Sequence, residues 1–180
     1  MTLTSILGPV AHVFPDDYDV DQIVGVKNIK VQDVDRLAEL ALDQLGPGFR
    51  EHLRPGGLLV AGANFGYGHP HFPAMRAMRK LGIRAVVAES FFPVYWRGEL
   101  SNGFPQVACA GIRQLVAPGD PIEIDFAAGA VRLPVRELAL PFEPLAASEV
   151  AMLEAGGFRT WLAQSLAAER REVDVKEAPR

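Results

Sequence analysis

The segment LLVAGANFGYGHPHFPAMRAMRKLGIRAVVA, residues 58–88, decides the fold of this chain. It begins with Leu58–Ala61, a run that is apolar at every position, and a strand apolar on both faces is typical of a buried parallel sheet. Residues 73–81 begin with proline and place methionine and leucine on one face of a predicted helix, with basic residues elsewhere. A glycine ends this helix, and residues 83–88 predict a second buried strand. We therefore expect a strand–glycine loop–helix–strand unit with a right-handed crossover.

The sequence on either side of this unit predicts further helices and a β-hairpin. Apolar residues recur at helical spacing over residues 34–45, with Asp33 as the N-cap and GPG, residues 46–48, as the end of the helix. Residues 23–24 suit a short strand. Residues 119–134 alternate apolar and polar side chains on either side of an AAGA turn, which predicts a hairpin.

The C-terminal part of the chain completes the expected architecture. Residues 147–172 form two predicted helical pieces that hinge at Gly156–Gly157, and Ser148 is the expected N-cap of the first. Residues 171–180 are charged and are expected to be frayed. The predicted fold is a single α/β domain over residues 1–180, with a central, mostly parallel sheet, flanking helices and an added β-hairpin.

Composition narrows the classes of function. The chain has 180 residues, 49% hydrophobic and 22% charged, which suits one domain with a sizeable core. A net charge of −4 gives no electrostatic case for nucleic acid. No apolar run reaches the about 20 residues that span a bilayer, and the N-terminal residues lack a secretory pattern, so we expect a cytoplasmic protein. The single cysteine, Cys109, lies in an apolar run and is predicted to be a core residue.

The loop GYGHPH, residues 66–71, is the first candidate site. It lies between the end of a strand and the start of a helix, where open α/β sheets bind ligands and where free N–H groups favour an anion. Gly66 and Gly68 would allow the backbone to approach a ligand closely. His69 and His71 would add proton-transfer groups. The loop therefore predicts a small anion, such as a carboxylate, as ligand.

Other interpretations of these residues remain open. The glycines could serve only to make a turn, because the loop lacks the third glycine of the dinucleotide fingerprint and the lysine of the P-loop. The HPH sequence could hold a metal, but no nearby histidine or carboxylate clearly completes a ligand set, so we expect no metal site. His12 and His52 are expected to be surface or structural histidines.

Several stretches of the chain resemble the small subunit of isopropylmalate dehydratase, which corresponds to the swivel domain of aconitase. They occur in the same order as in that family and cover most of the chain. The matching stretches are DVDQIVG at residues 19–25 (DTDQIIP in the family), ANFGYG at 63–68 (xNFGCG), GIRAVVAESF at 82–91 (GFRVVIAPSF), the segment of Asn102 (NNGLLP), the hairpin at 119–132 and the helix at 152–162.

The resemblance implies a swivel-type α/β fold and one subunit of a heteromeric hydro-lyase or isomerase. In that family, a large subunit holds a [4Fe–4S] cluster, and one iron of the cluster acts as a Lewis acid on the hydroxyl of a small hydroxy-carboxylic acid. The small subunit supplies a base and carboxylate-binding groups from a GSSREH loop. The resemblance therefore implies a large-subunit partner that carries the cluster, in agreement with the single cysteine of this chain.

This chain departs from the family at that loop, where residues 68–73 read GHPHFP. His69 stands at the position of the serine base, and His71 stands at the position of the carboxylate-binding arginine. In one interpretation, His69 is the general acid/base and His71 helps to hold a carboxylate. In another, the chain is a non-catalytic or regulatory partner subunit. A third is a stand-alone domain that binds a small anion or a metal through both histidines.

The resemblance also points to residues outside the histidine pair. Lys27 matches a basic position in a substrate-selecting segment, and is otherwise a solvated lysine. Asp21 and Gln22 match the DQ of the family, and either orient the site or cap a turn. Asn64 precedes the FG pair and is expected to hold the loop, while Tyr67 lies between the two glycines and is expected to line the pocket.

Overall fold

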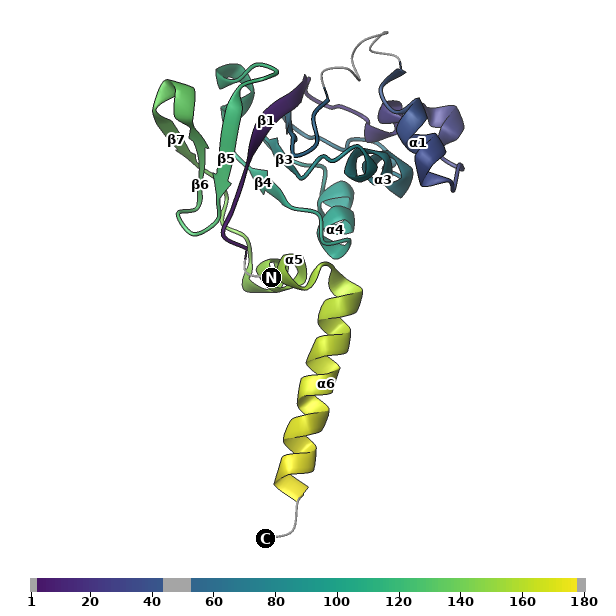
Figure 1. The fold of residues 1–180 in the computed structure, drawn as a ribbon, viewed down its shortest axis with the longest axis vertical. Helices are drawn as coiled ribbons and strands as arrows, with labels where there is room; N and C mark the ends of the chain where they lie inside the picture. Colours follow the sequence, from purple (N-terminus) through teal and green to yellow (C-terminus); the bar gives the residue numbers. More distant parts are fainter. Residues whose placement is uncertain (1–2, 44–52, 178–180) are drawn as a thin grey trace.

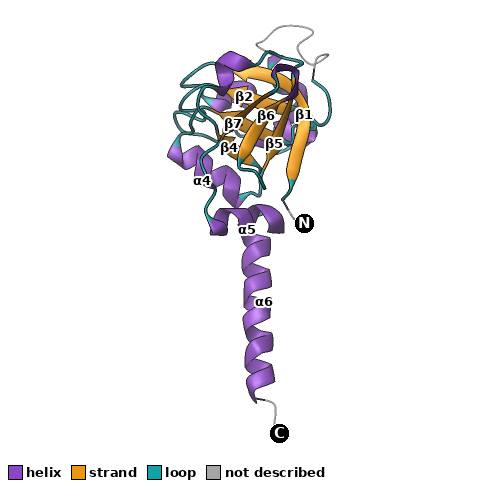
Figure 2. Ribbon diagram, turned by 90° about the vertical axis from the view of Figure 1, so that its left-hand side faces the viewer, coloured by secondary structure: helices purple, strands orange, loops and turns teal. Residues whose placement is uncertain are grey.

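The computed structural model describes residues 3–43 and 53–177, with side chains through residue 170, and contains one mixed β-sheet with helices packed on it (Figures 1 and 2). The sheet order is β4-β3-β2-β1-β5-β6-β7. The strands are β1 (Ser5–Phe14), β2 (Leu58–Ala61), β3 (Ala85–Ala88), β4 (Gln106–Ala108), β5 (Pro121–Asp125), β6 (Ala130–Leu133) and β7 (Leu138–Pro141).

Strand β1 joins the parallel and antiparallel halves of the sheet. It runs parallel to β2, with Val10 opposite Leu58, and antiparallel to β5, with Ile6 opposite Ile124. The predicted hairpin is confirmed as β5 and β6, but it belongs to the same sheet because β5 pairs with β1. Three of the six neighbouring pairs are therefore parallel, so the expectation of a mostly parallel sheet holds only for its β4-β3-β2-β1 half.

The helices of the described residues lie between and after these strands. The α-helices are α1 (Val34–Leu40), α3 (Phe72–Lys80), α4 (Pro93–Ser101), α5 (Ala147–Ala155) and α6 (Phe158–Glu177). The short 3₁₀-helices are η1 (Val20–Ile23), η2 (Val26–Asn28), η4 (Ile112–Leu115) and η5 (Pro134–Arg136).

The two helices predicted around the glycine loop are confirmed at their N-termini. Asp33 caps α1, because its carboxylate accepts the backbone N–H groups of Asp35 and Arg36, at 2.9 and 3.3 Å. Helix α3 begins at Phe72, one residue before the predicted start, with proline in its first turn. The length predicted for the first of these helices is wrong: α1 ends at Leu40, where Ala41 becomes extended, although the apolar pattern ran to residue 45. Residues 46–48, the predicted stop, lie outside the described residues.

Two further local predictions are wrong, and both errors concern capping. Ile23 belongs to the 3₁₀-helix η1 and not to a strand, because the Asp19 carboxylate accepts an N–H group in the first turn of that helix. Helix α5 is capped at Ala146 and not at Ser148. The N–H of Ala146 donates to the Glu149 carboxylate at 2.8 Å, which leaves Ser148 inside the first turn.

Two apolar cores lie on opposite faces of the sheet. Leu59 and Ala61 belong to the first core, together with residues of α1 and α3, while Leu58 and Val60 belong to the second, together with residues of β5 and β6. Successive side chains of a strand point to opposite faces, so all four residues of β2 are buried. The prediction of a strand buried on both faces is therefore confirmed.

Helix α6 extends away from the body of the domain (Figures 1 and 2). The predicted hinge before it is confirmed: Gly156, with φ of 81°, ends α5 in the left-handed conformation, and Gly157 follows with φ of 126°. Helix α6 continues through Glu177, although the sequence predicted fraying from residue 171, and residues 178–180 lie outside the described range. Among the described residues, no helix is long and apolar enough to cross a membrane.

Candidate functional site

The loop after β2 is tied to neighbouring segments through its own backbone. The N–H of Phe65 donates to the carbonyl of Ser90 at 3.0 Å, and Phe65 forms an isolated parallel bridge with Phe91. The N–H of Gly66 donates to the carbonyl of Tyr18 at 3.0 Å. The N–H of Gly66 is therefore already paired inside the domain.

Two hydrogen bonds connect His71 of this loop to Asp21. One carboxylate oxygen of Asp21 lies 2.7 Å from Nδ1 of His71, and the other accepts the backbone N–H of His71 at 3.0 Å. Asp21 is 5% exposed, whereas the His71 side chain is 37% exposed. The anion at the start of α3 is thus a carboxylate of the chain itself, and it holds both the backbone and the ring of His71.

The Asp21 contact determines what the His71 ring can do. A carboxylate beside Nδ1 requires a proton on that nitrogen, so a neutral His71 ring keeps its free lone pair on Nε2. A histidine oriented by a carboxylate in this way can accept a proton at Nε2, and the carboxylate then stabilises the imidazolium that forms. Among the described residues, this is the arrangement best suited to proton transfer in the loop.

His69 lies next to this pair but in a different environment. Its ring centroid is 5.1 Å from that of His71, with the two planes at 61°. The residue is exposed. The structure therefore brings the two predicted histidines together, and the buried carboxylate orients His71.

Different structural constraints favour glycine at residues 66 and 68 of the loop. Gly66 has φ of 85°, and a Cβ atom there would lie 2.2 Å from Cγ of Tyr95, so any side chain would overlap the buried Tyr95 ring. Gly68 has φ of 95°, but a Cβ atom there would lie no closer than 3.7 Å to the carboxylate carbon of Asp19. Packing requires glycine at residue 66, whereas at residue 68 only the backbone conformation does.

This difference gives a paired prediction for folding stability. Gly66→Ala is expected to lower the free energy of unfolding by about 2–5 kcal/mol, because the left-handed backbone and the overlap with Tyr95 both act. Gly68→Ala is expected to cost about 1–2 kcal/mol from the backbone alone. Urea denaturation of the two variants measures the difference, and equal losses would contradict this assignment.

Asn64 and Tyr67 lie on the same loop and have different surroundings. Asn64 adopts φ of 57°, its side-chain amide donates to Asp17 at 2.7 Å, and its N–H donates to the Ser90 hydroxyl at 2.8 Å. These contacts agree with a role in holding the loop. Tyr67 is 50% exposed, and its ring lies 6.1 Å from that of Phe92. Tyr67 is therefore half exposed on the loop that also carries the two histidines.

Lys27 and Gln22 lie on the two short 3₁₀-helices that lead away from Asp21. Gln22 follows Asp21 directly in η1 and is exposed, and Lys27 is the central, exposed residue of η2. Gln22 therefore lies beside the carboxylate that is bonded to His71, whereas Lys27 lies on the next 3₁₀-helix along the chain.

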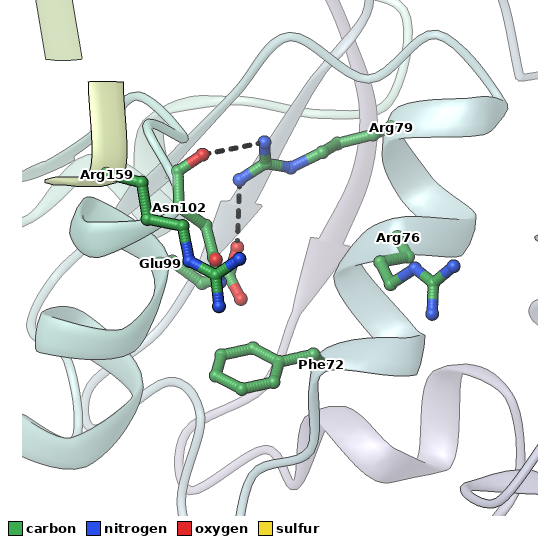
Figure 3. Close-up of a pocket in the computed structure, with 6 residues that line it drawn as sticks. All are labelled: Phe72, Arg76, Arg79, Glu99, Asn102 and Arg159. Carbon is green, nitrogen blue, oxygen red and sulfur yellow. Dashed lines mark hydrogen bonds and ion pairs between the residues drawn. The ribbon is translucent and has the colours of Figure 1, made fainter. Parts of the chain in front are cut away.

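A cavity that no sequence pattern indicated lies between α3, the end of α4 and the start of α6. It encloses about 600 Å³ and is lined by six residues from α3, α4 and α6: Phe72, Arg76, Arg79, Glu99, Asn102 and Arg159. Figure 3 shows the guanidinium of Arg79 turned toward Glu99 and Asn102, while Arg159 extends toward them from the start of α6. The two arginines of α3 were visible in the sequence only as its polar face, and no local pattern pointed to Arg159.

An ion pair between the partly exposed Arg79 and the buried Glu99 forms one wall of this cavity. Arg79 donates to the Glu99 carboxylate at 3.2 Å and to the carbonyl of Asn102 at 3.1 Å, and its guanidinium lies 4.5 Å from the ring centroid of Phe104. Glu99 is 4% exposed. Burial raises the pKa of Glu99 above its ordinary value, and the adjacent Arg79 partly offsets that rise.

Two other candidate side chains, those of Cys109 and His12, are buried or partly buried in the domain. Cys109 is fully buried, as predicted, and burial raises the pKa of its thiol to about 11. The His12 ring packs edge-on against Phe14 at 4.5 Å, and partial burial lowers its pKa. His52 lies outside the described residues. In the part of the chain that the structure describes, no three histidine, cysteine or acidic side chains are grouped as metal ligands.

Comparison with known proteins places the chain among dehydratase subunits. No protein-family model matches it. The 3-isopropylmalate dehydratase small subunit 1 of Methanopyrus kandleri is 36% identical over 147 residues, which cover 82% of this chain and 86% of the relative. Small subunit 2 of the same enzyme in Deinococcus radiodurans is 33% identical over 155 residues, covering 86% of this chain and 74% of the relative. The isopropylmalate/citramalate isomerase small subunit of Methanocaldococcus jannaschii is 29% identical over 154 residues.

A solved structure agrees with these relatives. The crystal structure of 3-isopropylmalate dehydratase from Methanocaldococcus jannaschii superimposes with a TM-score of 0.83 and 26% sequence identity, over 93% of this chain and 99% of that one. The fold class and the family that the sequence motifs indicated are therefore confirmed. With a swivel-type α/β fold and relatives matched over most of its length, the chain belongs to the 3-isopropylmalate dehydratase small-subunit family.

Proposed function

We propose that the chain is the small subunit of a heteromeric hydro-lyase or isomerase that acts on a small hydroxy-carboxylic acid in the cytoplasm. The names of its relatives, which include isopropylmalate dehydratase and isopropylmalate/citramalate isomerase small subunits, support this class of reaction. The observation that carries the proposal is the Asp21–His71 pair. It provides an oriented proton-transfer group on the loop that, in the family, supplies a base.

The proposal assigns the iron–sulfur cluster to the large subunit. Such clusters are held by several thiolates, and this chain has one cysteine, the buried Cys109, so its own residues do not fit the cluster. On the large subunit, the cluster would supply a Lewis acid for the substrate hydroxyl. The share of this chain is to bind the substrate carboxylates and to move a proton.

His71 is the proposed general base, with Asp21 as its positioning residue. Dehydration breaks a C–H bond and a C–O bond on adjacent carbons, and the proton on carbon must go to a base. Nε2 of His71 is proposed to accept it, and the Asp21 carboxylate at 2.7 Å from Nδ1 would stabilise the resulting imidazolium. In the reverse step, the same imidazolium would return the proton to carbon.

The roles proposed for the two histidines are exchanged relative to those that the resemblance suggested. His69 is exposed and adjacent, and it is proposed to bind a substrate carboxylate as a single-point donor. Lys27 is proposed to contact the distal group of the substrate. The remaining proposed substrate-site residues are Gly66, Tyr67, Gly68, Asn64 and Gln22.

A non-catalytic partner subunit is the second candidate. It is favoured by the replacement of both the serine and the arginine of the family loop, at His69 and His71. The ordered contact between Asp21 and His71 favours the catalytic candidate, because a loop that only stabilised a partner would have no need for a ring held by a buried carboxylate.

A substrate panel tests the proposed function. The chain is combined without oxygen with the large subunit of the same organism, the complex is isolated by size exclusion, and the appearance of unsaturated acid is followed with isopropylmalate, citramalate and related alkylmalates. We expect a stable complex with turnover on at least one of these hydroxy-acids. A complex inactive on every one would favour the non-catalytic candidate, and the absence of a complex would favour a stand-alone binding domain.

A further inference from the structure

The cavity lined by Arg76, Arg79 and Arg159, here called the arginine groove, carries a positive charge on a chain whose net charge is −4. Glu99 is the one carboxylate among its lining residues, and it already pairs with Arg79. Arg76 donates to the backbone carbonyl of Gln32 at 3.3 Å, which leaves its positive charge without a countercharge from that contact. Arg159 is an exposed residue whose side chain extends into the groove, whereas Arg76 is an exposed residue at the α3 edge of the groove, with its guanidinium directed away from Glu99 (Figure 3).

Exposed aromatic residues connect the arginine groove to the histidine loop. Phe72, which lines the groove, directly follows His71 and is 57% exposed. Its ring lies against Gly98 within α4, with Cε1 3.5 Å from where a Cβ atom of that glycine would be. Tyr67, on the loop itself, is 50% exposed. Aromatic residues and arginine are the side chains most enriched at protein–protein interfaces, so this composition is typical of a docking surface.

The lining of the groove fits a protein segment better than a small molecule. Small-molecule pockets are lined mainly by apolar side chains with a few polar groups. Here four of the six lining residues are charged, and Phe72 is the one apolar residue among them. Arginine pairs with carboxylates in a bidentate geometry, which favours aspartate and glutamate side chains as occupants.

We infer that the arginine groove docks an acidic segment of the large subunit, with carboxylates of that segment paired to Arg76 and Arg159. This inference rests on the proposed function, since it requires the large-subunit partner. Phe72, which lines the groove, directly follows His71. A large subunit that contributes residues to an active site at the histidine loop would therefore also lie next to the groove. The ion pair between Arg79 and the buried Glu99 carboxylate forms the wall against which the segment would lie.

Charge reversal at the two exposed arginines tests the inference. The dissociation constant of the complex with the large subunit is measured for the wild type and for the Arg76→Glu, Arg159→Glu double variant, at low and at high salt. The double variant is expected to raise Kd by about 100-fold at low salt, because like charges then face each other across the interface. Salt is expected to weaken the wild-type complex much more than the variant complex.

Arg136→Glu is the matched control, because Arg136 is an exposed arginine on η5, after β6 at the other end of the sheet. It is expected to change Kd by less than about 3-fold, as for a charge outside the interface. A double variant that binds like this control would overturn the inference, whether or not the wild type also binds citrate or inorganic phosphate in a parallel titration. Wild-type assembly and turnover in the same experiment report separately on the proposed function. If the wild type forms no complex, both proposals fail.

Discussion

Replacing His71 with asparagine is expected to lower kcat of the assembled enzyme by about 10²–10⁴-fold, the usual contribution of a positioned general acid or base. Asparagine keeps an N–H donor for the Asp21 carboxylate but has no ring nitrogen that can take a proton. Because Asp21 is buried and bonded to both the ring and the backbone of His71, the loop is expected to keep its conformation. The measurement is the initial rate of unsaturated-acid formation at saturating substrate, on a complex whose assembly has been verified.

Two further variants separate catalysis from structure at this pair. His69→Asn is expected to raise KM and to change kcat by less than about 10-fold, because a carboxylate-binding group acts on the ground state and the transition state alike. Asp21→Asn is expected to lower kcat with little change in KM, since it removes the carboxylate that orients His71. A kcat near that of the wild type in His71→Asn, or a larger loss of kcat in His69→Asn than in His71→Asn, would contradict the assigned roles.

Phe65→Ala is expected to lower the free energy of unfolding by about 3–5 kcal/mol, the range measured for removing a buried aromatic ring. Phe65 is fully buried, and its ring lies 5.5 Å from that of Phe14, 5.3 Å from that of Tyr95 and 6.3 Å from that of Phe91. These four rings come from three segments of the chain. The loss of Phe65 therefore leaves a void between β1, the glycine loop and the start of α4, and urea denaturation measures its cost.

Tyr67→Ala serves as the matched control for Phe65→Ala. It removes an aromatic ring two residues further along the same loop, but Tyr67 is half exposed. Its effect on the free energy of unfolding is expected to stay below about 1 kcal/mol, as for other surface substitutions. Similar losses in the two variants would mean that the ring cluster around Phe65 contributes little to stability.

The parts of the fold that were predicted correctly are those with a strong local pattern. Every residue of β2 is apolar, and the structure buries alternate residues in two different cores. The alternation of Ile122 and Ile124 indicated the hairpin, and both are buried. Asp33 immediately before an apolar-periodic stretch indicated the start of α1, where its carboxylate accepts two N–H groups.

The features that were missed depend on pairing between distant segments or on competing caps. The sequence of β1 does not indicate that this strand pairs with β2 on one edge and with β5 on the other. The equal number of parallel and antiparallel strand pairs in the sheet was therefore not predicted. Ile23 has an apolar neighbour and suited a strand, but the Asp19 side chain stabilises a 3₁₀ turn there instead. Serine is a common N-cap residue, which favoured Ser148. The Glu149 carboxylate instead accepts the N–H of Ala146, and Ala146 is the N-cap.

At the candidate site, too, contacts between neighbouring residues could be predicted, whereas contacts between distant segments could not. His69 and His71 are two residues apart, so their proximity followed from the loop alone. The contact between Asp21 and His71 spans 50 positions of sequence, and only the family motifs pointed to Asp21. The arginine groove gave no sequence signal, because Arg76 and Arg159 are polar surface residues of different helices until the fold brings them to one cavity.

The measurement that tests the central claim most directly is the rate of hydroxy-acid dehydration by the large subunit, with and without this chain. The two chains are titrated against each other without oxygen, and the unsaturated product is followed. We expect no turnover by the large subunit alone and a rate that rises with added chain until the large subunit is saturated. An equal rate without the chain, or an assembled complex in which the wild type and His71→Asn turn over equally, would contradict the central claim.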